Sequence, residues 1–269
     1  MKIDLKEDET VEDLQCNGLK LIQKKKGFRF GVDAVLLANF ADVRKGDTVL
    51  DIGTGTGIIS ILIAGKTGAE TIFGIEIQAE LAEMAKRSIM LNNLQDRVKI
   101  IQEDIKRGTE YFGASRFDVI VVNPPYMAQG SGLVNPEDSK ALSRHEIACT
   151  LEDIISVSSE LLVPGGQLAM VHRCERLVDV LYLMRAYSIE PKYIRFVHPL
   201  AHRRANIFLV KGAKGGRPQL KLMEPLYIYD SPGVYSGEIN RIYGRKQEEA
   251  HERRQDGNMS MGRIKHEQE

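Results

Sequence analysis

The sequence predicts an α/β fold in which helices cover a mostly parallel sheet. Short apolar stretches of strand character alternate with segments of helical periodicity along most of the chain. A glycine-rich loop follows the first of these strands, and polar or acidic residues stand at the carboxyl ends of the first four. Ligands bind at that edge in open α/β sheets, so the sequence predicts a fold class and a site together.

The first core strand, Thr48 to Leu50, leads through Asp51 into a loop whose glycines are Gly53, Gly55 and Gly57. A helix is expected to follow from Ile58 to Ala64. Glycines let the backbone approach a ligand closely, which is typical of a nucleotide-type cofactor site. A dinucleotide fingerprint needs its third glycine at position 58, which is isoleucine. The spacing and the carboxylate, which would repel a pyrophosphate, favour S-adenosylmethionine over NAD.

Two more strands are predicted after this loop, and each is followed by an acid and an isoleucine. Residues 71–76 end at Glu76, where a carboxylate can hold a ribose diol, and Ile77 can pack on an adenine face. A helix over 80–91 precedes the strand 98–102. Asp104 then can accept from the adenine amino group, with Ile105 against the ring. A lone acid at a strand end can instead cap a helix.

The fourth strand, residues 117–122, runs into Asn123-Pro124-Pro125-Tyr126. Two prolines remove two backbone donors, so the strand ends there and its last carbonyls stay free. The Asn123 amide oxygen and the Pro124 carbonyl offer two acceptors beside the Tyr126 ring. A planar exocyclic amino group needs two acceptors and an aromatic face, although a simple proline turn would use the same residues.

These four motifs resemble motifs I to IV of class I S-adenosylmethionine-dependent methyltransferases. The resemblance implies a Rossmann-like class I methyltransferase fold, with a mostly parallel seven-stranded sheet and a C-terminal antiparallel strand. It implies S-adenosyl-L-methionine as the cofactor, bound by Asp51, Gly53, Gly55, Gly57, Glu76, Ile77, Asp104, Ile105 and Asn123. The implied catalytic residues are Asn123, Pro124, Pro125 and Tyr126, and no metal is expected. The branch with this fourth motif methylates adenine N6 or a glutamine side chain.

Three further stretches are similar to the bacterial tRNA1(Val) adenine-N6-methyltransferase family, which modifies the adenine next to the anticodon. They are residues 28–38, 143–146 and 215–218, and the similarity extends from about residue 10 to about 230. The resemblance implies a tRNA substrate. Reduced thiols at Cys16, Cys149 and Cys174 would be typical of a cytoplasmic protein, and no obligate protein partner is predicted. His145, between Arg144 and Glu146, is left outside the catalytic set.

Three alternatives stay open. A protein-glutamine N5-methyltransferase acting on release factors uses the same amide chemistry, but it typically carries a helical domain before motif I. An rRNA or DNA amino-methyltransferase is the second, although DNA enzymes usually add a target-recognition domain. A non-enzymatic RNA-binding assembly factor is the third, and it would have no need of the acceptor pair at Asn123.

The flanking elements complete three predicted parts: residues 1–45, a methyltransferase core over 46–230, and an extension over 231–269, disordered from about 245. The first part contains a hairpin from Leu14 to Lys24 around Asn17-Gly18 and a helix through Phe40, capped by Asp33. Residues 128–142 are expected to form a mobile loop. Beyond it we expect helices over 151–162 and 178–186, a turn at 164–166 leading into a strand over 167–171, and an antiparallel pair at 193–198 and 206–210.

The composition is that of a compact enzyme without a membrane span. The 269 residues are 43% hydrophobic, and the three cysteines are too scattered for a disulfide framework. The 37 basic and 37 acidic residues give no net charge, whereas a tRNA binder normally carries a basic surface. Local clusters must therefore bind RNA, and the candidates are 24–26, 202–204 and 211–217.

Overall fold

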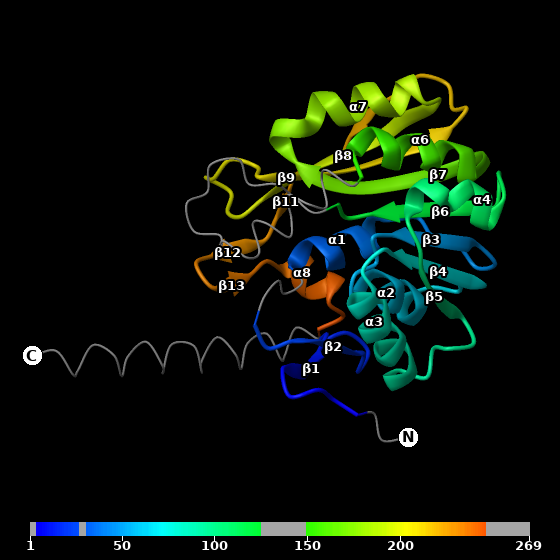
Figure 1. The fold of residues 1–269 in the computed structure, drawn as a ribbon. Coiled ribbons are helices and arrows are strands. Elements are labelled where there is room, and N and C mark those ends of the chain that lie inside the picture. Colours follow the sequence, from blue (N-terminus) through cyan, green and yellow to red (C-terminus); the bar gives the residue numbers. More distant parts are fainter. Residues whose placement is uncertain (1–3, 27–30, 125–148, 246–269) are drawn as a thin grey trace, which may run out of the picture.

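The computed structural model describes residues 4–26, 31–124 and 149–245. One twisted sheet divides the fold into two hydrophobic cores (Figure 1). Helices α1 (Val32–Phe40), α2 (Ile58–Lys66) and α3 (Ala79–Leu91) cover one face. Helices α4 (Gly108–Phe112), α6 (Leu151–Leu161) and α7 (Leu177–Ala186) cover the other. No helix in these ranges is long and apolar enough to cross a membrane.

The sheet has the strand order β10-β8-β9-β7-β6-β3-β4-β5, and β11 also pairs with β8. Its main strands are β3 (Thr48–Ile52), β4 (Thr71–Glu76), β5 (Val98–Gln102), β6 (Phe117–Val122), β7 (Leu162–Arg173), β8 (Ile189–His198) and β9 (Ile207–Lys214). Only β9 among these seven runs antiparallel to its neighbours. The Rossmann-like fold and its antiparallel C-terminal strand are thus confirmed.

Two very short strands make the sheet nine-stranded where seven strands were predicted. They are β10 (Lys221–Leu222) and β11 (Leu226–Tyr227), and both run parallel to β8. The order in which successive strands are added to the sheet reverses at β3, which pairs with β4 on one side and β6 on the other. Such a switch point opens a crevice at the carboxyl ends of the two central strands, which is where ligands bind.

Three local predictions need correction. Asp33 does not cap α1; the N-cap is Gly31, which has an extended backbone, and Asp33 lies in the first turn. Asp51 is not the last residue of β3, which continues to Ile52. The turn at 164–166 does not precede β7 but interrupts it as a bulge, where Gly165 has a φ of 80° and the register against β6 shifts.

The N-terminal hairpin exists, but its first arm lies earlier than predicted. It pairs β1 (Glu9–Asp13) with β2 (Lys20–Lys24), and Leu14 belongs to the connection rather than to an arm. Leu14 is buried in the core shared with α1 and α2. The first buried leucine of the predicted arm therefore lies after the first strand and not within it.

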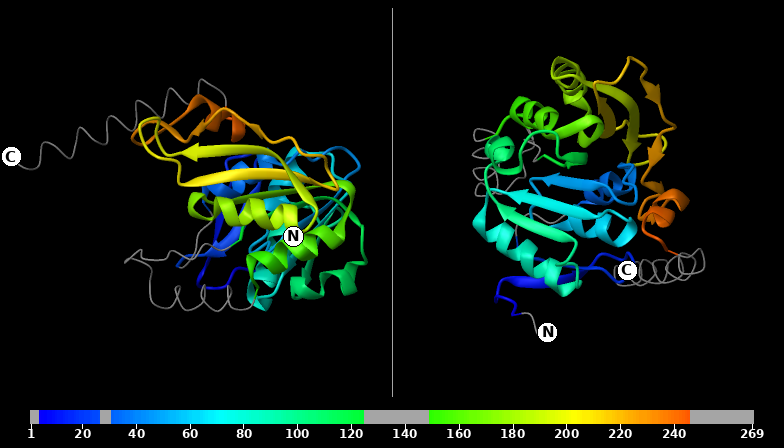
Figure 2. Two further views of the ribbon diagram at one scale, coloured as in Figure 1. Left: turned by 90° about the horizontal axis from the view of Figure 1, so that it is seen from above. Right: turned by 90° about the vertical axis from the view of Figure 1, so that its right-hand side faces the viewer.

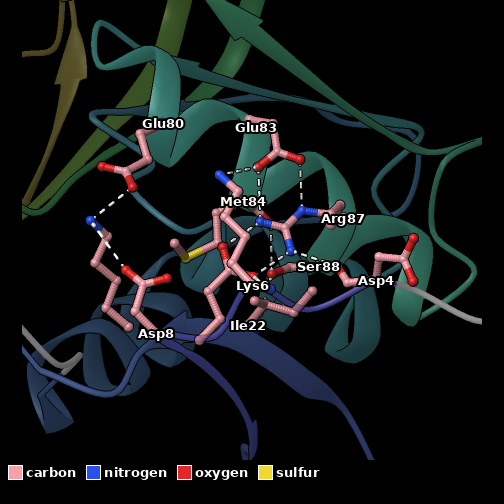
Figure 3. Close-up of polar contacts among 11 residues, drawn as sticks. Asp4, Lys6, Asp8, Ile22, Glu80, Glu83, Met84, Arg87 and Ser88 are labelled. Carbon is pink, nitrogen blue, oxygen red and sulfur yellow. Dashed lines mark hydrogen bonds and ion pairs between the residues drawn. The ribbon is translucent and has the colours of Figure 1, made fainter.

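The hairpin lies along α3, as the right-hand view of Figure 2 shows. Arg87 of α3 uses all its N–H groups: it donates bidentately to Glu9 of β1 and once to the Asp4 carbonyl, and bidentately to Glu83 of its own helix (Figure 3). The Glu9 side chain is only 1% exposed. Its hydrogen bonds from Arg87 lower the pKa of Glu9 to about 2, so a buried ion pair joins the hairpin to the core.

The C-terminal segment returns to the same side of the molecule. Helix α8 (Gly237–Ile242) buries Ile239 and Ile242 in the core formed by α1 and α2. Lys66 at the end of α2 donates to the Ile242 carbonyl. A short hairpin of β12 (Tyr229–Ser231) and β13 (Val234–Tyr235) precedes α8. The loop predicted over 128–142, His145 and the tail beyond 245 lie outside the described residues.

Candidate functional site

Asp51 lies at the centre of the carboxyl edge and is completely buried. Its Oδ2 accepts hydrogen bonds from the Thr54 hydroxyl (2.6 Å), the Ser60 hydroxyl (2.8 Å) and the Ser60 amide (3.1 Å). Its Oδ1 is buried without any hydrogen-bond partner. Burial raises the pKa of Asp51 to about 6. The hydrogen bonds from Thr54 and Ser60 oppose this increase, and the nearby Glu76 carboxylate adds to it.

The glycine loop forms an open cradle above this carboxylate. Gly53, Gly55 and Gly57 have φ values of 67°, 57° and 90°, a region that side-chain-bearing residues rarely adopt. A Cβ on Gly53 or Gly55 would meet no atom within 4 Å, so the space over these two residues is free. Gly57 instead packs on Ala85 of α3, where a Cβ would lie 3.3 Å from the alanine side chain.

The loop is held down by β4. The amides of Gly53 and Thr54 both donate to the Ile75 carbonyl, at 2.9 and 3.1 Å. Gly74 of β4 passes directly beneath, and a Cβ there would lie 2.9 Å from the Thr54 side chain. Thr54, Ser60 and Gly74 thus support the cradle, a role that the motif pattern did not identify. A serine inside the otherwise apolar helix 58–64 was the one available signal.

Glu76 reaches back from the end of β4 to the same loop. Its Oε2 accepts from the Gly55 amide (3.0 Å) and its Oε1 from the Gln78 amide (2.9 Å), so the carboxylate is fixed in orientation. The residue is 6% exposed. Ile77, next in the chain, is 44% exposed, which leaves an apolar face beside the carboxylate uncovered.

Asp104 lies at the end of β5 and caps the short 3₁₀ helix η1 (Ile105–Arg107). Its Oδ1 accepts from the Lys106 amide at 2.9 Å, and its Oδ2 lies 3.8 Å from the Lys106 ammonium. The helix-cap alternative is therefore correct. Ile105 is buried in the second core. A contact of either residue with the cofactor stays a prediction.

Asn123 and Pro124 follow β6 directly. Val122, the last residue of β6, pairs with Ile52 of β3, so Asn123 continues alongside the start of the glycine loop at Gly53. Asn123 is partly exposed. Pro125 and Tyr126 lie outside the described residues. The structure thus brings the first two residues of the fourth motif next to the first motif.

These residues fit S-adenosylmethionine. The unpartnered Asp51 Oδ1 offers an acceptor for an ammonium, because buried polar atoms are almost always hydrogen-bonded. The open cradle over Gly53 and Gly55 allows close approach of a ligand. The ordered Glu76 carboxylate keeps a second lone pair on each oxygen for a ribose diol.

Comparison with known proteins places the chain in a family. Residues 31–181 match the methyltransferase small domain family. A fold of this topology with this cofactor cradle is a class I S-adenosylmethionine-dependent methyltransferase. A curated relative from Porphyromonas gingivalis, named tRNA1(Val) (adenine(37)-N6)-methyltransferase, is 32% identical over 222 residues, covering 80% of this chain and 86% of the relative. The chain belongs to the methyltransferase small domain family and, within it, to the family that carries this name.

Other similar proteins extend the comparison. A protein of the same name from Aeromonas hydrophila is 28% identical and covers 77% of this chain and 85% of the relative. Among solved structures, a predicted O-methyltransferase from Agrobacterium tumefaciens aligns with a TM-score of 0.65 at 23% identity. That alignment covers 79% of this chain and 95% of the other. At this identity the structure supports the fold alone.

Proposed function

We propose that the protein transfers a methyl group from S-adenosylmethionine to the exocyclic N6 amino group of a tRNA adenine. The target is the adenine next to the anticodon of a valine tRNA. The observation that carries the proposal is the Asn123-Pro124 acceptor pair, in register with the glycine loop, in a chain whose curated relatives are named for this reaction. A tRNA substrate implies a cytoplasmic location.

The residues of this chain would align the adenine with the methyl group and make its N6 nitrogen a better nucleophile. When bound, S-adenosylmethionine supplies an electrophilic methyl group on a sulfonium. The adenine N6 nitrogen is a poor nucleophile because its lone pair is delocalised into the ring. Acceptance of its two hydrogens by the Asn123 amide oxygen and the Pro124 carbonyl would return density to nitrogen during attack. The nitrogen becomes strongly acidic once methylated, so no dedicated base is needed.

The adenine must leave its stack to reach the crevice, because an active-site pocket cannot enclose a base that is still stacked between its neighbours. Tyr126 is proposed to hold the extruded base by stacking, a contact worth about 1–3 kcal/mol. Gly53 and the glycine loop would hold the cofactor on the other side of the acceptor pair. The two substrates then meet between the ends of β3 and β6, which keeps the reaction in line.

One of the three basic clusters stands out as an RNA-binding surface. Strand β8 runs in the same direction as β6 and β7, so the loop after it, residues 199–206, emerges at the site edge of the sheet. Arg203 and Arg204 in this loop are exposed. The Asn206 carbonyl accepts from the Cys174 amide, which ties the loop to the end of β7.

The other clusters are largely used by the fold. Lys24 pairs with Glu80 at 2.8 Å. Lys211 is buried, donates to the Phe40 carbonyl and pairs with Asp42. Lys214 donates to the Leu162 carbonyl at the opposite edge of the sheet.

Neutralising Arg203 and Arg204 together is expected to weaken tRNA binding. Removing one phosphate contact should flatten the slope of log affinity against log salt by about one unit, because fewer counterions are released. Titration of labelled tRNA at several salt concentrations measures both quantities. Arg44 and Lys45 are exposed at the opposite edge of the sheet, before β3, so their double alanine variant is a control of equal charge. Equal effects of the two pairs would refute a local RNA surface.

The affinity for the cofactor is expected to depend on pH through Asp51. The pKa of Asp51 is about 6, and a cofactor ammonium beside Oδ1 would favour the carboxylate and lower that pKa. Binding would then release a proton below pH 6, and affinity should fall by up to about tenfold per pH unit there. Calorimetry with S-adenosylhomocysteine from pH 5 to 7.5 tests this. Asp51→Asn should remove the dependence, and a dependence that survives this substitution would contradict it.

The proposed function itself is tested with tRNA nucleosides. Mass spectrometry of tRNA from cells lacking the gene should show loss of N6-methyladenosine from one valine tRNA. Purified protein with S-adenosylmethionine should restore it. An unchanged tRNA together with loss of N5-methylglutamine from a release factor would identify the protein-glutamine alternative instead.

A further inference from the structure

Buried polar atoms without partners are rare in folded proteins and point to an absent ligand when they gather at a site. Three such side-chain atoms occur in the described part of the chain: Gln23 Nε2, Asp51 Oδ1 and Arg245 Nε. Arg245 lies over the rings of Tyr235 and Tyr243, which accounts for its position. Asp51 belongs to the cofactor cradle. Gln23 has no role in anything derived so far.

Gln23 is 2% exposed and lies in β2, the inner strand of the N-terminal hairpin. Its neighbour on the same face is Leu21, since side chains alternate along a strand. Leu21 is completely buried in the core that contains α1 and α2. Gln23 therefore lies on the hairpin face that meets the body of the enzyme, and its amide group is directed away from solvent.

The position of β2 along α3 places Gln23 near the site edge. Lys20, at the start of β2, exchanges hydrogen bonds with Asn92, which ends α3. Lys24, at the other end, pairs with Glu80 in the first turn of α3 (Figure 3). That first turn follows Glu76 and Ile77, so β2 runs toward the carboxyl edge of the sheet and Gln23 is its penultimate residue.

Helix α2 is consistent with this position. The Asn17 side chain donates to the Gly65 carbonyl, and a Cβ on Gly65 would lie 2.5 Å from Leu19, so β2 starts beside the end of α2. From Lys20 to Gln23 the strand advances roughly 10 Å, and α2 is about 13 Å long. Gln23 thus comes level with the first turn of α2, immediately after Gly57.

The two unpartnered atoms near the cradle are chemically complementary. Asp51 Oδ1 is an acceptor and suits an ammonium, whereas Gln23 Nε2 is a donor and suits a carboxylate. An α-amino acid group carries both, and in S-adenosylmethionine it forms the end remote from the adenine. We propose that Gln23 of the N-terminal hairpin donates a hydrogen bond to the carboxylate of the cofactor's methionine moiety. The hairpin then completes the cofactor site rather than only packing against it.

This inference rests on the assignment of the glycine loop to the cofactor in the proposed function. The test compares S-adenosylhomocysteine with 5′-methylthioadenosine, which has the same nucleoside thioether but lacks the amino-acid group. Gln23→Met keeps the side-chain length and removes the amide. By calorimetry it should weaken S-adenosylhomocysteine binding by roughly ten- to hundredfold, as for a hydrogen bond to a charged group, and leave methylthioadenosine binding unchanged. Gln23→Glu, which places a second carboxylate there, should weaken it further.

Two controls separate the possible outcomes. Gln95→Met changes an exposed glutamine in the connection between α3 and β5 and should alter neither affinity. Glu76→Ala should weaken both ligands, because both carry the ribose. Equal weakening of both ligands in Gln23→Met, or of neither, would overturn the proposal for Gln23. Failure of the unchanged protein to bind either ligand would instead refute the cofactor site.

Discussion

Replacing Asn123 by alanine is expected to lower kcat by at least about a hundredfold, a loss comparable to removal of one transition-state hydrogen-bond partner in other enzymes. The amide oxygen matters most when the attacking nitrogen gains electron density, so its loss acts on the transition state more than on bound ligands. Affinity for S-adenosylhomocysteine should stay within about twofold, since the glycine loop and Glu76 hold the cofactor independently. Single-turnover methylation of the tRNA and calorimetry measure the two effects separately.

Two further variants show whether the acceptor itself is responsible. Asn123→Asp keeps an acceptor oxygen at the same place and should retain more activity than Asn123→Ala. Tyr126→Phe keeps the ring and should largely preserve both kcat and tRNA affinity, whereas Tyr126→Ala should reduce both. Near-normal turnover of Asn123→Ala would mean that the four residues from Asn123 are only a proline turn. A Tyr126→Phe variant as inactive as Tyr126→Ala would assign the work to the hydroxyl.

The central strands were predictable because their patterns are local. Residues 71–76, 98–102 and 117–122 are β-strands with the bounds expected from the sequence, since buried parallel strands read as short apolar runs between turn residues. The bulge in β7 was not predictable from Pro164 and Gly165, which favour a turn in any context. Nor were β10 and β11, because two paired residues leave no periodicity to detect.

The site also contains residues that were predictable from the sequence and residues that were not. Asp51 and Glu76 lie in the last two residues of β3 and β4, and the glycines follow β3. Their meeting at one edge of the sheet therefore follows from the parallel topology. Gln23 gives no such signal, because it precedes the glycine loop by 30 residues and its proposed place beside the loop depends on the packing of the hairpin on α3. Its burial depends on contacts between the hairpin and α3, such as the Ile22 amide that donates to the Ser88 hydroxyl and the pair of Lys24 with Glu80. Contacts of this kind are read only from a structure.

Replacing Arg87 by methionine is expected to destabilise the protein by about 3–5 kcal/mol at pH 7, because the buried Glu9 carboxylate loses its partner. Urea unfolding at pH 7 measures this. The sign of the pH dependence follows from the pKa of Glu9, which lies at about 2 in the folded protein against an ordinary 4.5. The pair stabilises fully above pH 4.5 and loses its contribution as pH falls toward 2. The difference between the two proteins should therefore narrow below pH 4.5.

Arg107 provides the matched control. It also contacts two glutamates, Glu103 and Glu110, but its side chain is 62% exposed. Arg107→Met should therefore change stability far less than Arg87→Met, because solvent screens exposed ion pairs. Adding Glu9→Met to Arg87→Met should recover part of the stability, because two apolar side chains can replace a buried ion pair. If Arg87→Met cost no more than Arg107→Met, the pair would be irrelevant to stability. The hairpin would then be held on α3 by its apolar face, the Asn92 and Ser88 hydrogen bonds and the Lys24–Glu80 ion pair.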